Sequence, residues 1–245
     1  MRMRMLDLGE RPALEALALE ESLLEHLDRG DGEPAWVLWS SPARVIVLGT
    51  ARPSGGDVFL EHAREDGVRV LRRRSGGGTV VLGPGSPAVT LVDRLSGDIR
   101  ECYRRFCEVL IAAVARLGLT AEFRAPADLA VGELKIAGLA QRRKKNAALV
   151  TASVLSGSMA DAAARYLVEP GPEDSPGYRR GRGHGEFMTS LLELGAAEDD
   201  RAFLKALRTE LEARGAAAGA VSERERAGAA GISEELEDSE WIYRF

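Results

Sequence analysis

Residues 72–81 read RRRSGGGTVV, so three arginines run directly into three glycines. The flanking runs Val68–Arg73 and Thr79–Leu82 predict two strands joined by a glycine-rich turn. Glycine lets a ligand approach the backbone closely, and guanidinium groups beside backbone N–H groups suit phosphate or carboxylate. The stretch is not a P-loop, because no Gly-Lys-Ser/Thr follows it. It predicts an anion site, with a hairpin turn after a solvated basic strand end as the alternative.

The elements around this turn are hairpin-like strands flanked by helices. Apolar residues at helical spacing predict long helices over residues 12–27 and 99–117. We expect further strands at 36–40, 44–50, 88–92, 121–124, 128–131, 134–141 and 148–155. The order of helix, strands, helix, strands and helices predicts an α+β fold rather than a βαβ series.

The remaining segments are shorter or polar. We expect helices at 59–66, 159–167, 186–194 and 200–214. Residues 169–185 are predicted to form a loop, and residues 215–231 a flexible or loosely helical stretch. The aromatic end, Trp241–Phe245, is expected to dock back on the fold.

Composition narrows the class of protein. The chain has 245 residues, 45% hydrophobic and 29% charged, which suits one large domain or one domain with a small appendage. A net charge of −5 with 5% aromatic residues disfavours a nucleic-acid partner. Two cysteines and three histidines give neither a disulfide framework nor a zinc motif. Without a signal-peptide pattern or an apolar run near 20 residues, we expect a cytoplasmic protein with no membrane partner.

Lys135 is the second candidate for chemistry. It opens an otherwise apolar strand and is followed closely by the small residues Ala137 and Gly138. A lysine there reaches a phosphate or a carbonyl oxygen as a point charge. On the sequence alone, a lysine at the end of a hairpin is the favoured interpretation.

Two further features are weaker candidates. Residues 178–184, YRRGRGH, suit an anion or an acidic partner surface, but a solvated basic loop is favoured, and His184 alone is a weak acid–base candidate. Cys102 and Cys107 lie on or beside the apolar stripe of the helix at 99–117. Core packing is therefore favoured over a nucleophilic role.

The two main motifs together resemble the lipoate–protein ligase A family of the biotin/lipoate ligase superfamily. They are RRSGGGTV at 73–80 and, after Asp128-Leu129, KIAGLAQRR at 135–143. The resemblance runs from Leu14 to Leu194. It implies a mixed, largely antiparallel sheet flanked by helices, as in a biotin/lipoate ligase-like catalytic domain. We expect that domain over residues 1–195, with residues 196–245 as a helical extension packed on it and no separate full accessory domain.

The resemblance also implies an activity. Lipoate or octanoate would be activated by ATP with Mg²⁺ to an acyl-adenylate, and the acyl group transferred to a lysine of a lipoyl domain. That acceptor would be of the 2-oxoacid dehydrogenase E2 or glycine-cleavage H protein type. Lys135 is implied as the catalytic residue, and no side chain is expected as a metal ligand. The residues expected around the acyl-adenylate are Arg73, Ser75, Gly76, Gly77, Gly78, Thr79, Val80, Val81 and Lys135.

The apolar acyl chain needs a tunnel of small and aliphatic residues. The residues that we expect to line it are Val45, Val47, Val70 and Ala137.

The sequence departs from the family pattern in three places. Relatives carry a His-His-Gly run where this chain has residues 149–155, so Thr151 and Ser153 are candidates to replace it. We expect no full accessory domain in this chain, which makes a separate accessory subunit an expected partner. No cysteine lies near residues 124–127 or beyond the lysine strand, which disfavours a thioester route. The alternatives are an ATP-independent octanoyl or lipoyl transferase, acting from acyl-carrier protein or between lipoyl domains, and a non-catalytic lipoyl-AMP-binding paralogue.

Overall fold

The fold is built on a large mixed sheet, as expected. The computed structural model describes residues 3–196 and 201–245. In the large sheet of the described residues, β1 runs parallel to β2 and β11, and every other neighbouring pair is antiparallel. The strand order is β11 (Ala217–Ala218), β1 (Arg4–Glu10), β2 (Ala35–Ser40), β6 (Ala88–Arg94), β10 (Ala147–Val154), β9 (Leu134–Arg143), β8 (Asp128–Val131) and β7 (Glu122–Arg124).

A second, three-stranded sheet carries the arginine–glycine motif. Its order is β4 (Arg69–Arg72), β3 (Val45–Leu48) and β5 (Val80–Leu82). Residues 75–79, here called the glycine segment, join β4 to β5. The amide of Gly76 donates to the carbonyl of Gln141, 3.2 Å away. This bond ties the glycine segment to β9 of the large sheet.

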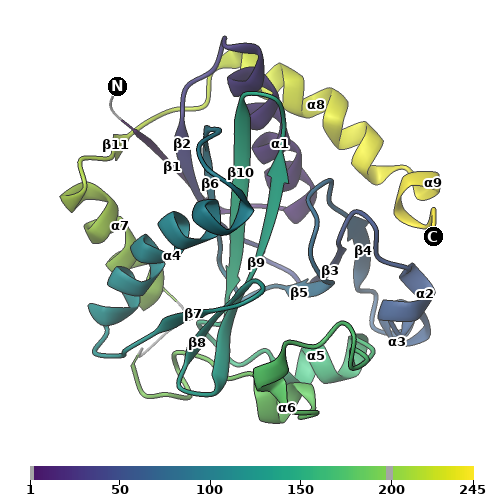
Figure 1. The fold of residues 1–245 in the computed structure, drawn as a ribbon. Coiled ribbons are helices and arrows are strands. Elements are labelled where there is room, and N and C mark those ends of the chain that lie inside the picture. The colour runs from purple at the N-terminus through teal and green to yellow at the C-terminus, as the bar shows by residue number, and fades with distance from the viewer. Residues whose placement is uncertain (1–2, 197–200) are drawn as a thin grey trace.

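Helices cover both faces of the large sheet (Figure 1). α4 (Ile99–Ala115) and α7 (Ala202–Ala213) pack on one face, where the rings of Trp36 and Phe106 stack 5.5 Å apart. α1 (Ala13–Arg29) packs on the other face, and α8 (Glu223–Glu237) lies along α1.

The small sheet is covered in the same way. One face contributes to the core beneath α1, and the other packs on short helices. Those helices are α3 (Leu60–Glu65), α5 (Ala160–Tyr166) and α9 (Ser239–Ile242). Three further short helices are α2 (Ser54–Asp57), η1 (Gly177–Arg179) and α6 (His184–Phe187).

The long helices and most strands lie where the sequence predicts them, but two segments differ. The helix expected at 186–194 is wrong, because α6 ends at Phe187 and Met188 is extended and bridges to Lys135. Of the flexible or loosely helical stretch expected at 215–231, the helical alternative is correct from Glu223 onward, and the flexible one is wrong. The stretch contains β11 and the start of α8, which Ser222 and Glu225 begin with a reciprocal capping box.

The prediction also missed β1. The helix expected at 200–214 is observed as α7, and residue 200 lies outside the described residues. The docking of the aromatic end is confirmed, since the indole Nε1 of Trp241 donates to the carbonyl of Arg72 at 2.9 Å.

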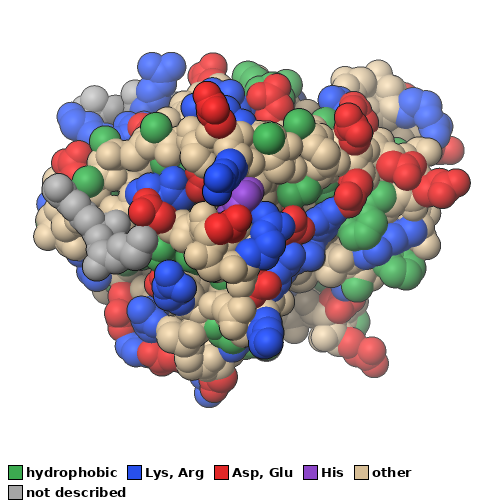
Figure 2. Space-filling model, turned by 90° about the horizontal axis from the view of Figure 1, so that it is seen from above, with side chains coloured by type: hydrophobic (Ala, Val, Ile, Leu, Met, Phe, Trp, Pro, Cys, Tyr) green, Lys and Arg blue, Asp and Glu red, His purple; other side chains and the backbone are tan. Residues whose placement is uncertain are grey.

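Charges of both signs are interspersed on the face seen in Figure 2. Glu25 of α1, for example, is 3.2 Å from the side-chain nitrogens of both Arg74 and Lys144. In the described ranges, no helix is long and apolar enough to span a bilayer.

Candidate functional site

A cavity of about 610 Å³ lies between the two sheets and the segment that follows β10. Of the predicted site residues, Ser75 and Gly76 do not line it, and the others do. Its apolar wall includes Leu17, Trp39, Val47, Leu82, Ala88, Leu139, Ala140 and Phe187. Its polar side chains include Glu20, Arg52, Asp57, Arg73, Thr79, Asp128, Lys135, Thr151, Ser153, Arg179 and His184.

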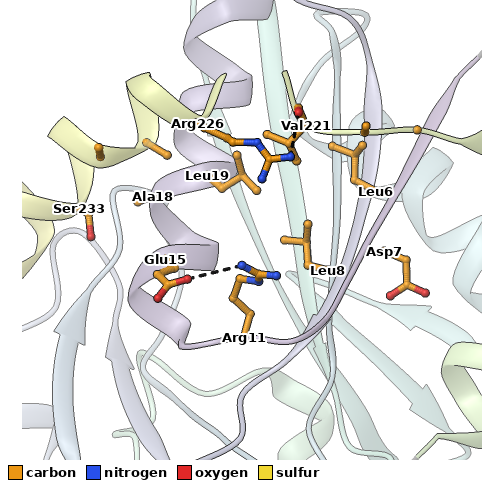
Figure 3. Close-up of a pocket in the computed structure, with 14 residues that line it drawn as sticks. Leu6, Asp7, Leu8, Arg11, Glu15, Ala18, Leu19, Val221, Arg226 and Ser233 are labelled. Atoms are coloured by element: carbon orange, nitrogen blue, oxygen red, sulfur yellow. Dashed lines mark hydrogen bonds and ion pairs between the residues drawn. The ribbon is translucent and has the colours of Figure 1, made fainter. Parts of the chain in front are cut away.

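A second cavity, of about 440 Å³, lies between β1, α1 and α8 (Figure 3). Leu6, Leu8 and Leu19 line it, and Arg11 and Arg226 reach over it. None of the predicted site residues lines this cavity, so the first cavity is the candidate site.

Lys135 is held at the wall of the candidate site by a buried carboxylate. Its Nζ lies 2.6 Å from Oδ1 of Asp128, whose Oδ2 accepts a hydrogen bond from the Tyr178 hydroxyl at 2.9 Å. A Cβ on Gly138 would lie 3.1 Å from the lysine Nζ, so the missing side chain makes room for the ammonium. Burial raises the pKa of Tyr178, which keeps its hydroxyl a donor to Asp128.

Arg73 holds the glycine segment from inside. It is buried, and its Nη2 donates to the carbonyls of Gly76 at 2.6 Å and Gly78 at 2.7 Å. Burial lowers the pKa of Arg73 to about 10, so the guanidinium is still charged at neutral pH. Arg73 binds the carbonyls of this segment, whereas the amides of Gly77 and Gly78 donate to no described residue. Two free amides beside a buried cation make an anion-binding corner.

The turn at residues 49–54 packs against this corner through its backbone atoms. The amide of Thr50 donates to the carbonyl of Ser75 at 3.0 Å. A Cβ on Gly49 would lie 2.0 Å from the carbonyl oxygen of Gly77. Only glycine fits at position 49, and Gly77 itself has a φ of +88°.

The far end of this turn places an ion pair that sequence reasoning missed. Arg52 donates to both oxygens of Asp57, at 2.7 and 2.6 Å, and approaches Asp174 at 3.2 Å. The Thr79 hydroxyl also donates to Asp57, and these carboxylates raise the pKa of Arg52. The pair therefore links the 49–54 turn to the glycine segment.

Glu20 is a second missed residue. It is 3% exposed and accepts from the indole of Trp39 at 2.7 Å and from the hydroxyl of Thr90 at 2.6 Å. Thr90 also lies 2.8 Å from the hydroxyl of Thr151. Burial raises the pKa of Glu20 to about 7, so the carboxyl is largely neutral below that pH. Thr151, a candidate to replace the His-His-Gly run, thus contacts the cavity, as does Ser153.

The favoured interpretation of residues 178–184 as a solvated loop is wrong for two of them. Arg179 and His184 are 5% and 8% exposed, line the cavity and share Glu169 as a partner. Burial lowers the pKa of His184, so its ring is neutral at pH 7. Of the three arginines in this stretch, Arg180 is the exposed one, with a side chain that is 73% exposed. Because glycines interrupt the arginines, the stretch has no periodic pattern from which its buried positions could be predicted.

Of the four residues predicted to line an acyl tunnel, Val47 lines the cavity. Val45, Val70 and Ala137 are buried but do not line the cavity. Ala137 packs in the core beneath α4, since β9 alternates its side chains and presents Gly138 to the cavity.

The core role of Cys107 is confirmed. The residue is 1% exposed, and burial raises the pKa of its thiol to about 12. Neither cysteine lines the cavity.

Comparison with known proteins identifies the family. Residues 12–212 match the lipoyl protein ligase A/B catalytic domain. The chain belongs to this family. The lipoate-protein ligase LplJ of Bacillus subtilis is 31% identical over 125 residues, which are 51% of this chain and 37% of that protein. The octanoyltransferase LipM of Symbiobacterium thermophilum is 29% identical over 178 residues, or 62% and 64% of the two chains. The matches thus span about a third to two-thirds of these two relatives.

Solved structures agree on the ligase A/B fold. A bi-partite lipoate protein ligase of Thermoplasma acidophilum, described with its E2 lipoyl domain, superposes with a TM-score of 0.86 at 21% identity, covering 99% of this chain and 96% of that one. A lipoate-protein ligase A bound with ATP gives a TM-score of 0.85 at 21% identity, covering 99% of each chain. The expected mixed sheet flanked by helices is therefore confirmed as the fold of this family.

Proposed function

We propose that the chain is a lipoate–protein ligase, which joins lipoate or octanoate to ATP and then passes the acyl group to a lysine of a lipoyl domain. The observation that carries the proposal is the meeting of Lys135 with the glycine segment at one cavity wall. The apolar wall suits a medium-length acyl chain, and the amides of Gly77 and Gly78 suit an anionic group. The names of the ligase relatives and of the ATP-bound neighbour support it.

The first chemical step would form the acyl-adenylate. A carboxylate oxygen of the acid attacks the α-phosphorus of ATP, and the bond to pyrophosphate breaks. The Lys135 ammonium and the two glycine amides would stabilise the negative charge on the α-phosphate oxygens. Asp128 keeps the ammonium at the wall, which reduces the reorganisation needed when the substrates bind.

The second step would transfer the acyl group. The amine of the acceptor lysine attacks the acyl carbonyl carbon, AMP leaves, and the amine proton passes to solvent. Lys135 would also stabilise the oxyanion that develops on that carbonyl. Arg73 would take part through the glycine segment, because its Nη1 and Nη2 donate to backbone carbonyls.

Mg²⁺ would enter with ATP. In the described part of the chain, no three His, Cys, Asp or Glu side chains are grouped as a metal site. Mg²⁺ is commonly held by one or two carboxylates together with substrate phosphates, and Asp57 and Asp174 are the cavity carboxylates near Arg52 that suit this role. Bound there, the ion would supply neutralisation of phosphate charge.

The bi-partite ligase described with its E2 lipoyl domain supports a lipoyl domain as the acceptor here and a separate accessory subunit as a further partner. The proposal also treats residues 196–245 as an extension of the catalytic unit at 1–195. The packing of α7 on α4 and of α8 on α1 supports this organisation.

An octanoyltransferase is the second candidate function, favoured by the similarity to LipM. A covalent thioester route through Cys107 is not supported, because this thiol is buried and hard to ionise. The transferase would therefore have to act by direct transfer from the carrier protein.

Intact-mass spectrometry of an apo lipoyl domain separates these functions. One reaction contains lipoate, ATP and Mg²⁺, and the other contains octanoyl-carrier protein without ATP. The proposal predicts a lipoyl mass gain only in the first, with Lys135→Ala as the inactive control. A gain only in the second identifies a transferase. Adenylate binding with no gain in either reaction identifies a non-catalytic paralogue or a missing accessory subunit.

A further inference from the structure

We propose that residues 241–245, here called the aromatic segment, are a positioning part of the ligand site. They lie outside the cavity wall and at least 160 positions along the chain from the motif at 72–81. They fix the turn at 49–54, and through this turn they hold the glycine segment and the ion pair of Arg52 with Asp57. Figure 1 shows α9 and the end of the chain beside β4 and α2.

The first link is the guanidinium of Arg72, which is fully buried. Its Nη1 donates to the carbonyls of Gly49 at 2.9 Å and Arg52 at 2.6 Å. Its Nε donates to the carbonyls of Trp241 at 3.1 Å and Ile242 at 2.9 Å. One side chain thus joins both ends of the turn to the aromatic segment.

Arg72 forms no ion pair with a carboxylate of the described residues, although the charge of Asp57 favours its charged form, and its Nη2 has no hydrogen-bond partner. Its guanidinium lies over the ring of Phe245, 5.5 Å from the ring centre. A buried cation without an anionic partner depends on such carbonyl and ring contacts. Arg72 therefore stays in place only while the aromatic segment covers it.

The second link is direct. The Arg244 guanidinium donates to the backbone carbonyl and the hydroxyl of Thr50, and it stacks on the indole of Trp241. The carbonyl of Phe245 accepts from the amide of Ser54 at 3.1 Å and from its hydroxyl at 3.0 Å. Both ends of the turn are therefore fastened to the aromatic segment without the help of Arg72.

The turn then positions the site. The amide of Thr50 donates to Ser75 of the glycine segment, and Gly49 packs against the carbonyl of Gly77, which belongs to the proposed anion corner. Arg52 reaches the cavity and pairs with Asp57. Loosening the aromatic segment must therefore disorder the amides and the ion pair together, while Lys135 keeps its own partner on β8.

The test uses the double variant Trp241→Phe/Arg244→Ala in the full chain. The first change removes only the indole N–H bond and keeps a ring, and the second removes the bonds to Thr50. Glu240→Ala is the matched control, because this exposed side chain lies on α9 just before the aromatic segment and forms no hydrogen bond or ion pair with the described residues. The readouts are amide hydrogen exchange by peptide and, because the inference rests on the proposed function for its kinetics, KM and kcat.

We expect amide exchange in residues 49–57 and 75–79 to rise about tenfold in the double variant, with α4 and the control unchanged. KM for ATP and for the acid should rise about tenfold at nearly constant kcat. Faster exchange confined to residues 239–245 would overturn the inference. A fall in kcat at constant KM, with a lower Tm, would show a merely structural role. If the wild type turns nothing over, the proposed function fails, and the exchange of residues 75–79 still decides the inference.

Discussion

Replacing Glu20 with glutamine should remove a pH-dependent loss of stability. The carboxyl is 3% exposed, and burial raises its pKa from 4.5 to about 7. Between these values the unfolded chain has released the proton and the folded chain has kept it, so the free energy of unfolding of the wild type falls as pH rises. The difference corresponds to about 3 kcal/mol, fully expressed above pH 7 and absent below pH 4.

Urea unfolding of wild type and Glu20→Gln at pH 4.5, 6, 7 and 8 measures this effect. The glutamine keeps an oxygen for Trp39 and Thr90 and cannot ionise, so the stability of the variant relative to wild type should rise by about 3 kcal/mol between pH 4.5 and pH 8. Glu15→Gln is the control, because this carboxylate lies on the same helix but is 57% exposed. A difference between Glu20→Gln and wild type that does not change with pH would refute the reasoning.

Three other substitutions test separate parts of the site. Lys135→Ala should lower acyl transfer at least about 100-fold with Tm nearly unchanged, measured by product mass and thermal unfolding, because the lysine is part-exposed and its charge acts on the ligand. Gly49→Ala should cost about 1–3 kcal/mol in urea unfolding and weaken nucleotide binding, since its Cβ would overlap the Gly77 carbonyl. Cys107→Ser should lower stability by about 1–3 kcal/mol and leave kcat unchanged, because it buries a hydroxyl in an apolar core. Equal kcat in Lys135→Ala, unchanged stability in Gly49→Ala, or an inactive folded Cys107→Ser would each contradict these assignments.

The fold followed from sequence where periodicity was strong. The helix at 99–117 repeats apolar residues at helical spacing, and α4 ends within two residues of that range. β1 was missed because Asp7 and Gly9 interrupt its apolar residues and because both of its partners, β2 and β11, lie far along the chain. α8 was predicted only as a flexible or loosely helical stretch because its composition is rich in alanine, glycine and charge. Its stability comes from packing on α1 and from the buried pair of Glu225 with Arg4.

The site was predictable in part for a similar reason. Lys135 and the glycine segment are contiguous motifs, and the sheet brings them to one cavity. Arg73 contacts loop carbonyls, because a buried guanidinium must satisfy its own donors first. Glu20 and Asp57 carry no local signature, since their place in the cavity depends on how α1 and the 49–54 turn pack. Ser222 and Glu225 have the spacing of a helix capping box, and this pattern could have predicted where α8 begins.

Formation of the acyl-adenylate is the most direct test of the proposed activity. The purified chain is incubated with lipoate, ATP and Mg²⁺ but no acceptor, and the bound small molecules are identified by mass spectrometry. We predict lipoyl-AMP with pyrophosphate release from the wild type and neither product from Lys135→Ala. Intact ATP and lipoate with the wild type, under conditions in which the lipoyl domain is still modified, would contradict the account.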